Sequence, residues 1–401
     1  MTGRRGGPAW LLVGAVLLAA LNLRTAVTSV GPLLDELRSG LGLSSLLAGV
    51  LTTLPVLSFA ALGGLTPRVA HRVGERQALA GALLMMTAGL FLRSLVSSVG
   101  LFLLCSVAAL AGGAMGNVLL PVLVKRHFPN RIGGMTAAYT TAMAIGTTAG
   151  AALAVPLASL RTPPDWRLGL GAWSVLAAAA ALVWLPLAAR ARRPASGSTG
   201  RVRMSLRRSP TAWALTVFFA AQSLQAYVAF GWFALFFREQ AGASPATAGL
   251  LLGVLAGLAI PISMVIPTLA TRWSSQRPLV AFLVACYLVA YVGMLAVPRA
   301  GAWLEVLLVG VGGGAFPLAL TMIGLRARTP DATAALSAFV QSVGYLLAAA
   351  GPVLVGVLHG ASHGWGLPFV LLFVDLALMG VAGWYVGRPR YVEDDLAAAG
   401  T

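Results

Sequence analysis

The longest hydrophilic stretch of this chain reads "ARARRPASGSTGRVRMSLRRSP", from Ala189 to Pro210. It is rich in Arg, Ser and Gly, which is the composition of a flexible basic linker. The rest of the 401-residue chain is apolar, with 58% hydrophobic residues, 10% charged residues and a mean hydropathy of +0.87. Soluble domains carry about 25% charged residues. The composition therefore indicates a polytopic membrane protein that is interrupted near its middle by a polar segment.

Apolar runs of membrane-spanning length lie on both sides of this segment. Six precede it and six follow it, and each is long enough to cross the hydrocarbon core as a helix. The first run follows Arg4 and Arg5 and so resembles a signal peptide, but its length and the many later runs favour a span. The predicted spans are 9–34, 43–66, 77–96, 99–123, 132–160, 168–189, 211–236, 245–270, 278–297, 303–325, 332–358 and 365–387.

The distribution of charge predicts the orientation of these spans. The formal net charge is +17, and with the N-terminus inside, most of the 28 basic residues fall on cytoplasmic segments. We therefore predict a multi-pass protein of the plasma (inner) membrane with both termini in the cytoplasm. The basic segments are expected to meet anionic membrane lipid rather than nucleic acid. The outer segments hold only Arg38, Arg93, Arg161, Arg167, Arg238 and Arg299.

The two halves of the chain match each other at a nearly constant offset of 200 residues. Such an offset, maintained across aligned spans, indicates an internal duplication. Examples are Gly31 with Gly231, Pro67 with Pro267, Gly112 and Gly113 with Gly312 and Gly313, and, at offset 201, Thr136 with Ser337 and Gly150 with Gly351. We predict an N-terminal six-helix bundle over residues 1–189, a basic cytoplasmic linker over 190–210 and a C-terminal six-helix bundle over 211–401.

This layout resembles the major facilitator superfamily, in which two six-helix halves are joined by a basic cytoplasmic loop. Spans 1 and 2 read "LNLRTAVTSVGPLLDEL" (21–37) and "AGVLTTLPVLSFAALGGLTPRVAHRVG" (48–74), and they resemble the cyanate-permease and 2-nitroimidazole-transporter branch. Pro67 stands near the place where the family signature after span 2 carries an aspartate. The resemblance implies an all-α membrane protein with twelve transmembrane helices in two pseudo-symmetric bundles. It also implies a substrate site near the bilayer midplane and alternating access.

Span 1 carries an unusual charge, Arg24, near its middle. An arginine at the centre of a span costs about 2.5–3.5 kcal/mol on insertion scales. On a helical wheel, Asn22, Thr25 and Ser29 share one face, whereas Arg24 and Thr28 share a nearly opposite face. A helix that is polar on both sides is expected inside the bundle. Two interpretations remain open: Arg24 ties helices together, or it binds an anionic or dipolar solute through its guanidinium fork.

Other polar residues at membrane depth complete the predicted substrate site. The second half has amides where the first half has Arg24, and spans 5 and 11 carry polar stripes at repeat-related positions. Helix packing through interhelical hydrogen bonds is the alternative for each of them. The candidates are Asn22, Arg24, Asn117, Tyr139, Thr140, Gln222, Gln225, Gln341 and Tyr345. Asp375, near the middle of span 12, is a candidate for coupling transport to protons.

The predicted function is secondary active or facilitative transport of a small anionic or planar polar solute. The resemblance adds cyanate-like anions and nitroimidazole-like heterocycles as substrate classes. Multidrug efflux is the alternative within the same fold, but the basic midplane charge disfavours it; a receptor or an intramembrane enzyme is more remote. Neither Cys105 and Cys286 nor His359 and His363 form a pattern typical of a metal site. We expect no cofactor and a monomeric protein.

Overall fold

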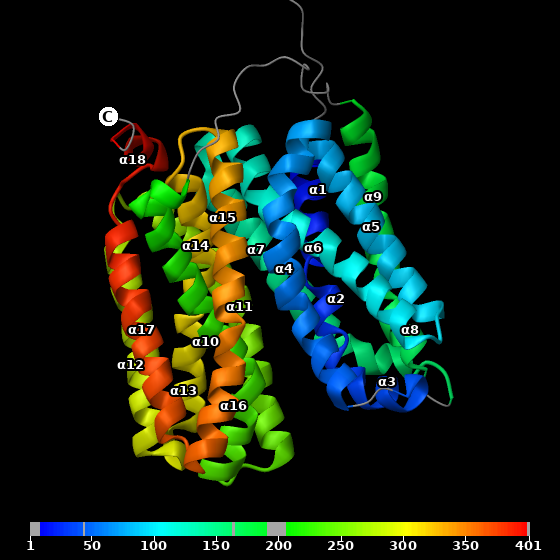
Figure 1. The fold of residues 1–401 in the computed structure, drawn as a ribbon, viewed down its shortest axis with the longest axis vertical. Coiled ribbons are helices and arrows are strands. Elements are labelled where there is room, and N and C mark those ends of the chain that lie inside the picture. The colour runs from blue at the N-terminus through cyan, green and yellow to red at the C-terminus, as the bar shows by residue number, and fades with distance from the viewer. Residues whose placement is uncertain (1–8, 43–44, 163–164, 191–205, 399–401) are drawn as a thin grey trace, which may run out of the picture. The chain divides into compact units, whose positions relative to one another are not determined.

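The computed structural model describes residues 9–42, 45–162, 165–190 and 206–398. Most of the predicted linker lies outside these residues. Within them, eleven helical segments are long and apolar enough to cross a membrane, and α4, Ser45–Val73, covers the predicted second span. The chain divides into two units, which are residues 1–123 with 138–200 and residues 124–137 with 201–401. The long helices of each unit run alongside one another (Figure 1).

Most predicted spans of the first half are single helices, but span 1 is broken into several short elements. The helices are α1 Ala9–Asn22, α2 Thr25–Thr28, α3 Leu34–Leu41, α4 Ser45–Val73, α5 Glu75–Leu95, α6 Val99–His127, α7 Ile132–Ala158, α8 Trp166–Gly171 and α9 Trp173–Ala189. In unit 1, α5 packs against α4, α8 and α9, and α1 also packs against α9.

The second half forms a helical bundle centred on α10. Its helices are α10 Pro210–Gln240, α11 Pro245–Arg272, α12 Arg277–Ala296, α13 Pro298–Gly312, α14 Ala315–Leu325, α15 Pro330–Ala348, α16 Ala350–Ser362, α17 Gly366–Val386 and α18 Val392–Ala398. Capping residues define several starts: Ser209 and Thr329 accept from backbone N–H groups three residues on, and each is followed by a proline at the first helical position. α10 packs against α15 and α17, while α12 packs against α13.

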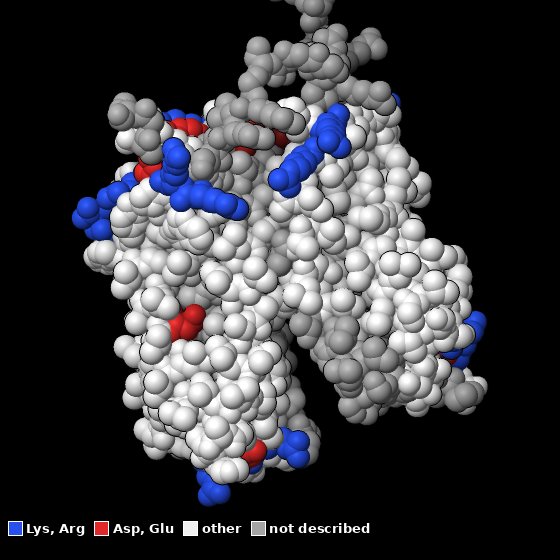
Figure 2. All heavy atoms as spheres, viewed as in Figure 1, with Lys and Arg blue, Asp and Glu red and all other residues white. Residues whose placement is uncertain are grey.

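Charged side chains are concentrated at the ends of the helices. On the face shown in Figure 2 they gather at the two ends of each unit, and the middle is almost uncharged. Large apolar side chains such as Leu104, Leu182, Phe282 and Val381 are exposed along α6, α9, α12 and α17. An uncharged band with exposed apolar side chains is expected where a protein meets lipid.

Glycines bring the broken part of span 1 against α6 and α7. A Cβ atom on Gly113 or Gly116 of α6 would collide with Leu23, and one on Gly146 of α7 would collide with the backbone carbonyl of Leu21. Gly113 and Gly116 belong to the glycine-rich stretch at 111–116, and their close neighbour is the broken segment of span 1. The backbone approach at Leu21 leaves no room for a side chain.

We expect Gly146→Ala to lower the free energy of unfolding by about 1–3 kcal/mol, because the new methyl group must displace backbone rather than a side chain. The melting temperature of the purified protein measures this effect. Gly14→Ala is the matched control, since a Cβ on Gly14 of α1 meets nothing within 4 Å. Equal melting temperatures for the two variants would show that the backbone around Leu21 accommodates the new methyl group without a loss of stability.

Candidate functional site

Arg24 lies at a break in span 1 rather than within a continuous helix. α1 ends at Asn22 and α2 begins at Thr25, so Leu23 and Arg24 form the connection. Arg24 has φ −119° and ψ −6°, and its side chain is partly buried. The Thr25 hydroxyl donates to the Asn22 carbonyl over 2.9 Å and so replaces a backbone bond lost at the break. Irregular backbone at membrane depth is tolerated where it is buried in protein or lines a cavity.

The two polar faces predicted for span 1 have different environments. Asn22, Thr25 and Ser29 are fully buried, whereas Arg24 and Thr28 are partly exposed. The Asn22 amide donates to the Leu18 carbonyl (2.8 Å) and to the Leu176 carbonyl of α9 (3.3 Å). Asn22 therefore connects α1 to α9 inside unit 1. Its part in binding a substrate stays a prediction.

Arg93 of α5 holds the segment that follows the break. Its side chain is fully buried, and its guanidinium donates from Nη1 to the Ala26 carbonyl (3.1 Å) and from Nη2 to the Ser29 hydroxyl (3.2 Å). The prediction that Arg93 lies on the outer side of the membrane stays a prediction, and its burial was not foreseen from the sequence. The apolar residues around Arg93 in "GLFLRSLV" (89–96) were the feature of the sequence that could have indicated its burial. A buried guanidinium needs fixed hydrogen-bond acceptors, and the short helix α2 after Arg24 supplies one of them, the Ala26 carbonyl.

The other predicted residues of unit 1 are buried on neighbouring helices. Tyr139 and Thr140 lie on α7, Asn117 lies on α6, and each is less than 5% exposed. Burial at membrane depth is compatible with both a packing role and a binding role for such groups. Their role in substrate binding stays a prediction.

In unit 2, Gln222 lies on α10, one turn after the aromatic residue Phe219. The Gln222 amide donates to the Phe219 carbonyl (3.0 Å) and to the Ser223 hydroxyl (2.6 Å). The Phe219 ring meets the Tyr345 ring edge-on, with centroids 4.9 Å apart. Tyr227 and Phe316 extend this aromatic cluster, with centroids 6.4 Å from Tyr345 and 6.1 Å from Phe219, and both are partly exposed. Gln222 and Tyr345 were predicted from the sequence, whereas Phe219, Tyr227 and Phe316 were not.

Gln341 occupies the polar stripe of α15. Its amide nitrogen donates to the Ser337 hydroxyl over 2.8 Å, one helical turn away, as the spacing of four residues predicts. Tyr345 follows one turn later on the same helix. The stripe predicted from the sequence is therefore a real succession of buried polar side chains on α15.

Gln225 is engaged inside unit 2. Its Nε2 atom donates to Asp375 Oδ2 (2.8 Å) and to the Leu372 carbonyl (3.1 Å), both on α17. Its Oε1 atom accepts a hydrogen bond from the Tyr291 hydroxyl of α12. This network links three helices and gives the buried carboxyl of Asp375 an amide partner. The roles predicted for Gln225 in substrate binding and for Asp375 in coupling stay predictions.

Comparison with known proteins agrees with the helical layout. Residues 16–349 match the family model described as the Major Facilitator Superfamily. The chain is 38% identical over 388 residues to the 2-nitroimidazole transporter of Escherichia coli (strain K12), covering 96% of this chain and 97% of that protein. It is 30% identical over 350 residues to the cyanate transport protein CynX of the same organism, covering 86% of this chain and 89% of that protein.

A solved structure shows the same fold at much lower sequence similarity. The proton:xylose symporter XylE, bound to 6-bromo-6-deoxy-D-glucose, matches with a TM-score of 0.75 and 12% identity, covering 97% of this chain and 98% of that one. At this identity the likeness concerns the fold alone. The predicted arrangement of twelve transmembrane helices is confirmed.

Proposed function

This chain belongs to the Major Facilitator Superfamily, and on that premise we propose that it carries a small anionic or planar polar solute across the inner membrane by alternating access. The relatives named for 2-nitroimidazole and cyanate transport suggest the substrate classes. Membership of a transporter family also points to transport rather than catalysis.

The observation that carries this proposal is the position of Arg24 at the break in span 1. A charged side chain at membrane depth is expensive, and a broken helix there gives up backbone hydrogen bonds. Discontinuous spans recur at the substrate sites of secondary transporters. A guanidinium presents a planar fork of donors that suits nitro, carboxylate-like and other planar acceptor groups. Binding of the solute by Arg24 would explain why the chain keeps both a charge at membrane depth and a broken helix.

The aromatic cluster of unit 2 supports the planar substrate class. Tyr227 and Phe316 are partly exposed beside the buried pair Phe219 and Tyr345, with the amide of Gln222 hydrogen-bonded to the Phe219 carbonyl. Flat heterocycles pack favourably against aromatic rings, and amides give directional hydrogen bonds. We propose that this cluster selects solutes with a flat ring.

A binding panel on the purified protein tests the proposal. The panel contains cyanate, 2-nitroimidazole, imidazole, xylose and a bulky cationic drug. A ligand of the folded state stabilises it by about 2.7 kcal/mol at a hundredfold excess over its dissociation constant, which raises the melting temperature. We expect a rise with cyanate or 2-nitroimidazole, and we expect ligands that stabilise the protein to be carried into proteoliposomes. A response confined to the cationic drug would refute the proposal and indicate multidrug efflux.

A further inference from the structure

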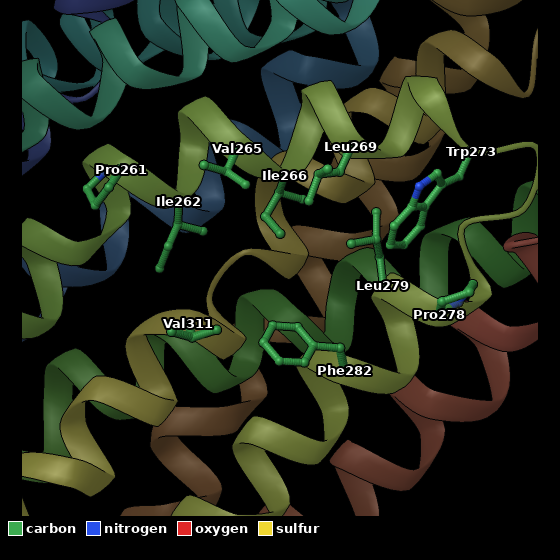
Figure 3. A pocket seen from close by; sticks show the side chains of 10 residues that line it. All are labelled: Pro261, Ile262, Val265, Ile266, Leu269, Trp273, Pro278, Leu279, Phe282 and Val311. Atoms are coloured by element: carbon green, nitrogen blue, oxygen red, sulfur yellow. The ribbon is translucent and has the colours of Figure 1, made fainter.

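An apolar groove runs along the outside of unit 2 between α11, α12 and α13. It has a volume of about 450 Å³, which is in the range of small-molecule sites. Its walls include Ile262, Ile266, Phe282 and Val311, and Trp273 and Pro278 lie at one end of it (Figure 3). Val265 and Phe282 are about half exposed, so the groove is open to the surroundings of the helix bundle.

Three arginines lie near the end of the groove where α12 begins. Arg277 directly precedes the groove residue Pro278, and it lies against Gly387, the neighbour of Arg388, where a Cβ atom would meet the Arg277 backbone nitrogen and Cγ at 3.0 Å. Arg277 donates from Nε to the Trp384 carbonyl (2.8 Å) and stacks on the Trp384 ring. Arg390 stacks on Tyr385 and donates to its hydroxyl over 2.9 Å. We call Arg277, Arg388 and Arg390 the arginine cluster.

Backbone contacts fix the start of α12 to the end of α17. The Gln276 N–H donates to the Gly387 carbonyl over 2.8 Å, and the Ser275 hydroxyl donates to the same carbonyl. Arg326 is buried beneath this junction, where it donates to the Val386 carbonyl (2.8 Å) and to the Gln276 side chain. Burial lowers the pKa of Arg326 to about 10, so its guanidinium remains charged at neutral pH. The junction therefore holds the like charges together.

The nearby acidic side chains do not neutralise the arginine cluster. Within residues 206–398, none of its three members forms an ion pair. The carboxylates of α18 are engaged elsewhere: Glu393 accepts from the backbone N–H of Arg328, Asp394 pairs with the Arg328 side chain, and Asp395 accepts from Ser209 and from the Thr211 N–H. Three cations held together without a counter-ion, beside an open apolar groove, are complementary to an amphiphile with an anionic head.

We propose that unit 2 binds an anionic phospholipid, with its phosphate on the arginine cluster and an acyl chain in the groove. Guanidinium groups match phosphate oxygens in pairs. Tryptophans such as Trp273 and Trp384 are typical of the level of lipid headgroups. Basic pockets between transmembrane helices favour anionic lipids. This site is independent of the transported solute.

Native mass spectrometry of the full-length protein in neutral detergent tests this site. Phosphatidylglycerol and phosphatidylcholine with identical acyl chains are the probes. We expect phosphatidylglycerol to bind more tightly than phosphatidylcholine. The double variant Arg388→Gln/Arg390→Gln should bind phosphatidylglycerol about 30-fold more weakly than the parent does, because two charges that attract the anionic lipid are lost. Arg207→Gln/Arg208→Gln removes the same charge from exposed arginines elsewhere in unit 2 and is expected to bind phosphatidylglycerol like the parent.

A second variant separates the headgroup from the chain. Val265→Trp fills the groove without altering the arginine cluster. We therefore expect this variant to bind phosphatidylglycerol more weakly than the parent does and to bind glycerol phosphate equally well. Unchanged melting temperatures without lipid show that each variant is folded. Equal binding of phosphatidylcholine, equal losses in the two double variants, or displacement of the lipid by equimolar glycerol phosphate would each overturn the proposal. If the parent had the mass of a dimer and Val265→Trp had the mass of a monomer, the groove would bind a second copy of this chain instead of a lipid.

Discussion

Arg24→Gln is expected to fold and to lose nearly all affinity for the transported solute. Glutamine keeps a polar group at the break in span 1 but removes the charge and the paired donors of the guanidinium. Losing a charged partner in a desolvated site costs about 2–5 kcal/mol, which is roughly 30-fold or more in the dissociation constant. The measurement is the dissociation constant of the solute identified by the binding panel, compared between variant and parent.

Two controls separate binding from folding in this experiment. The melting temperature without ligand shows whether the variant is folded. Arg24→Lys keeps the charge but lacks the planar fork, so its affinity should fall between those of the parent and Arg24→Gln. If Arg24→Gln binds the solute as tightly as the parent does, Arg24 is a structural tie between helices and the substrate site lies elsewhere.

The layout of the helices was predictable because its causes are local in the sequence. Apolar length specifies a span. The orientation inferred from the asymmetry of basic residues stays a prediction. The positions of the helix breaks were not predictable in the same way. Gly112 and Gly113 match Gly312 and Gly313 in the repeat, yet α6 continues through the first pair, whereas α13 ends at Gly312. Glycine permits both outcomes, and the neighbouring helices decide between them.

The partners of the polar side chains were also beyond the reach of the sequence. Gln225 and Asp375 are 150 residues apart, and only the packing of α10 against α17 brings them within 2.8 Å. The helical wheel correctly separated two polar faces of span 1, because its positions depend on residue spacing alone. It could not show that Arg93, from another helix, would meet the Ala26 carbonyl and the Ser29 hydroxyl.

Arg93→Met is expected to loosen the segment that follows Arg24 and to weaken solute binding while the protein stays folded. Methionine fills much of the same volume and removes a buried charge, so the global stability should change little. The Ala26 carbonyl, however, loses its donor, and an unsatisfied buried acceptor costs about 1–3 kcal/mol locally. Hydrogen exchange of amides 23–30 should therefore accelerate roughly tenfold or more relative to the parent.

The pair of readouts distinguishes what Arg93 does. Faster exchange together with weaker binding means that Arg93 positions the break that presents Arg24. Unchanged exchange with weaker binding means instead that its charge acts on the solute directly, and Arg93→Lys should then restore part of the affinity. Arg161→Met removes an exposed arginine of the same unit that pairs with Asp165, and it should change neither readout, because surface ion pairs contribute about 0–1 kcal/mol. If Arg93→Met also changes neither, the two hydrogen bonds to Ala26 and Ser29 do not hold the segment, and the break in span 1 is maintained by the glycines of α6 and α7 alone.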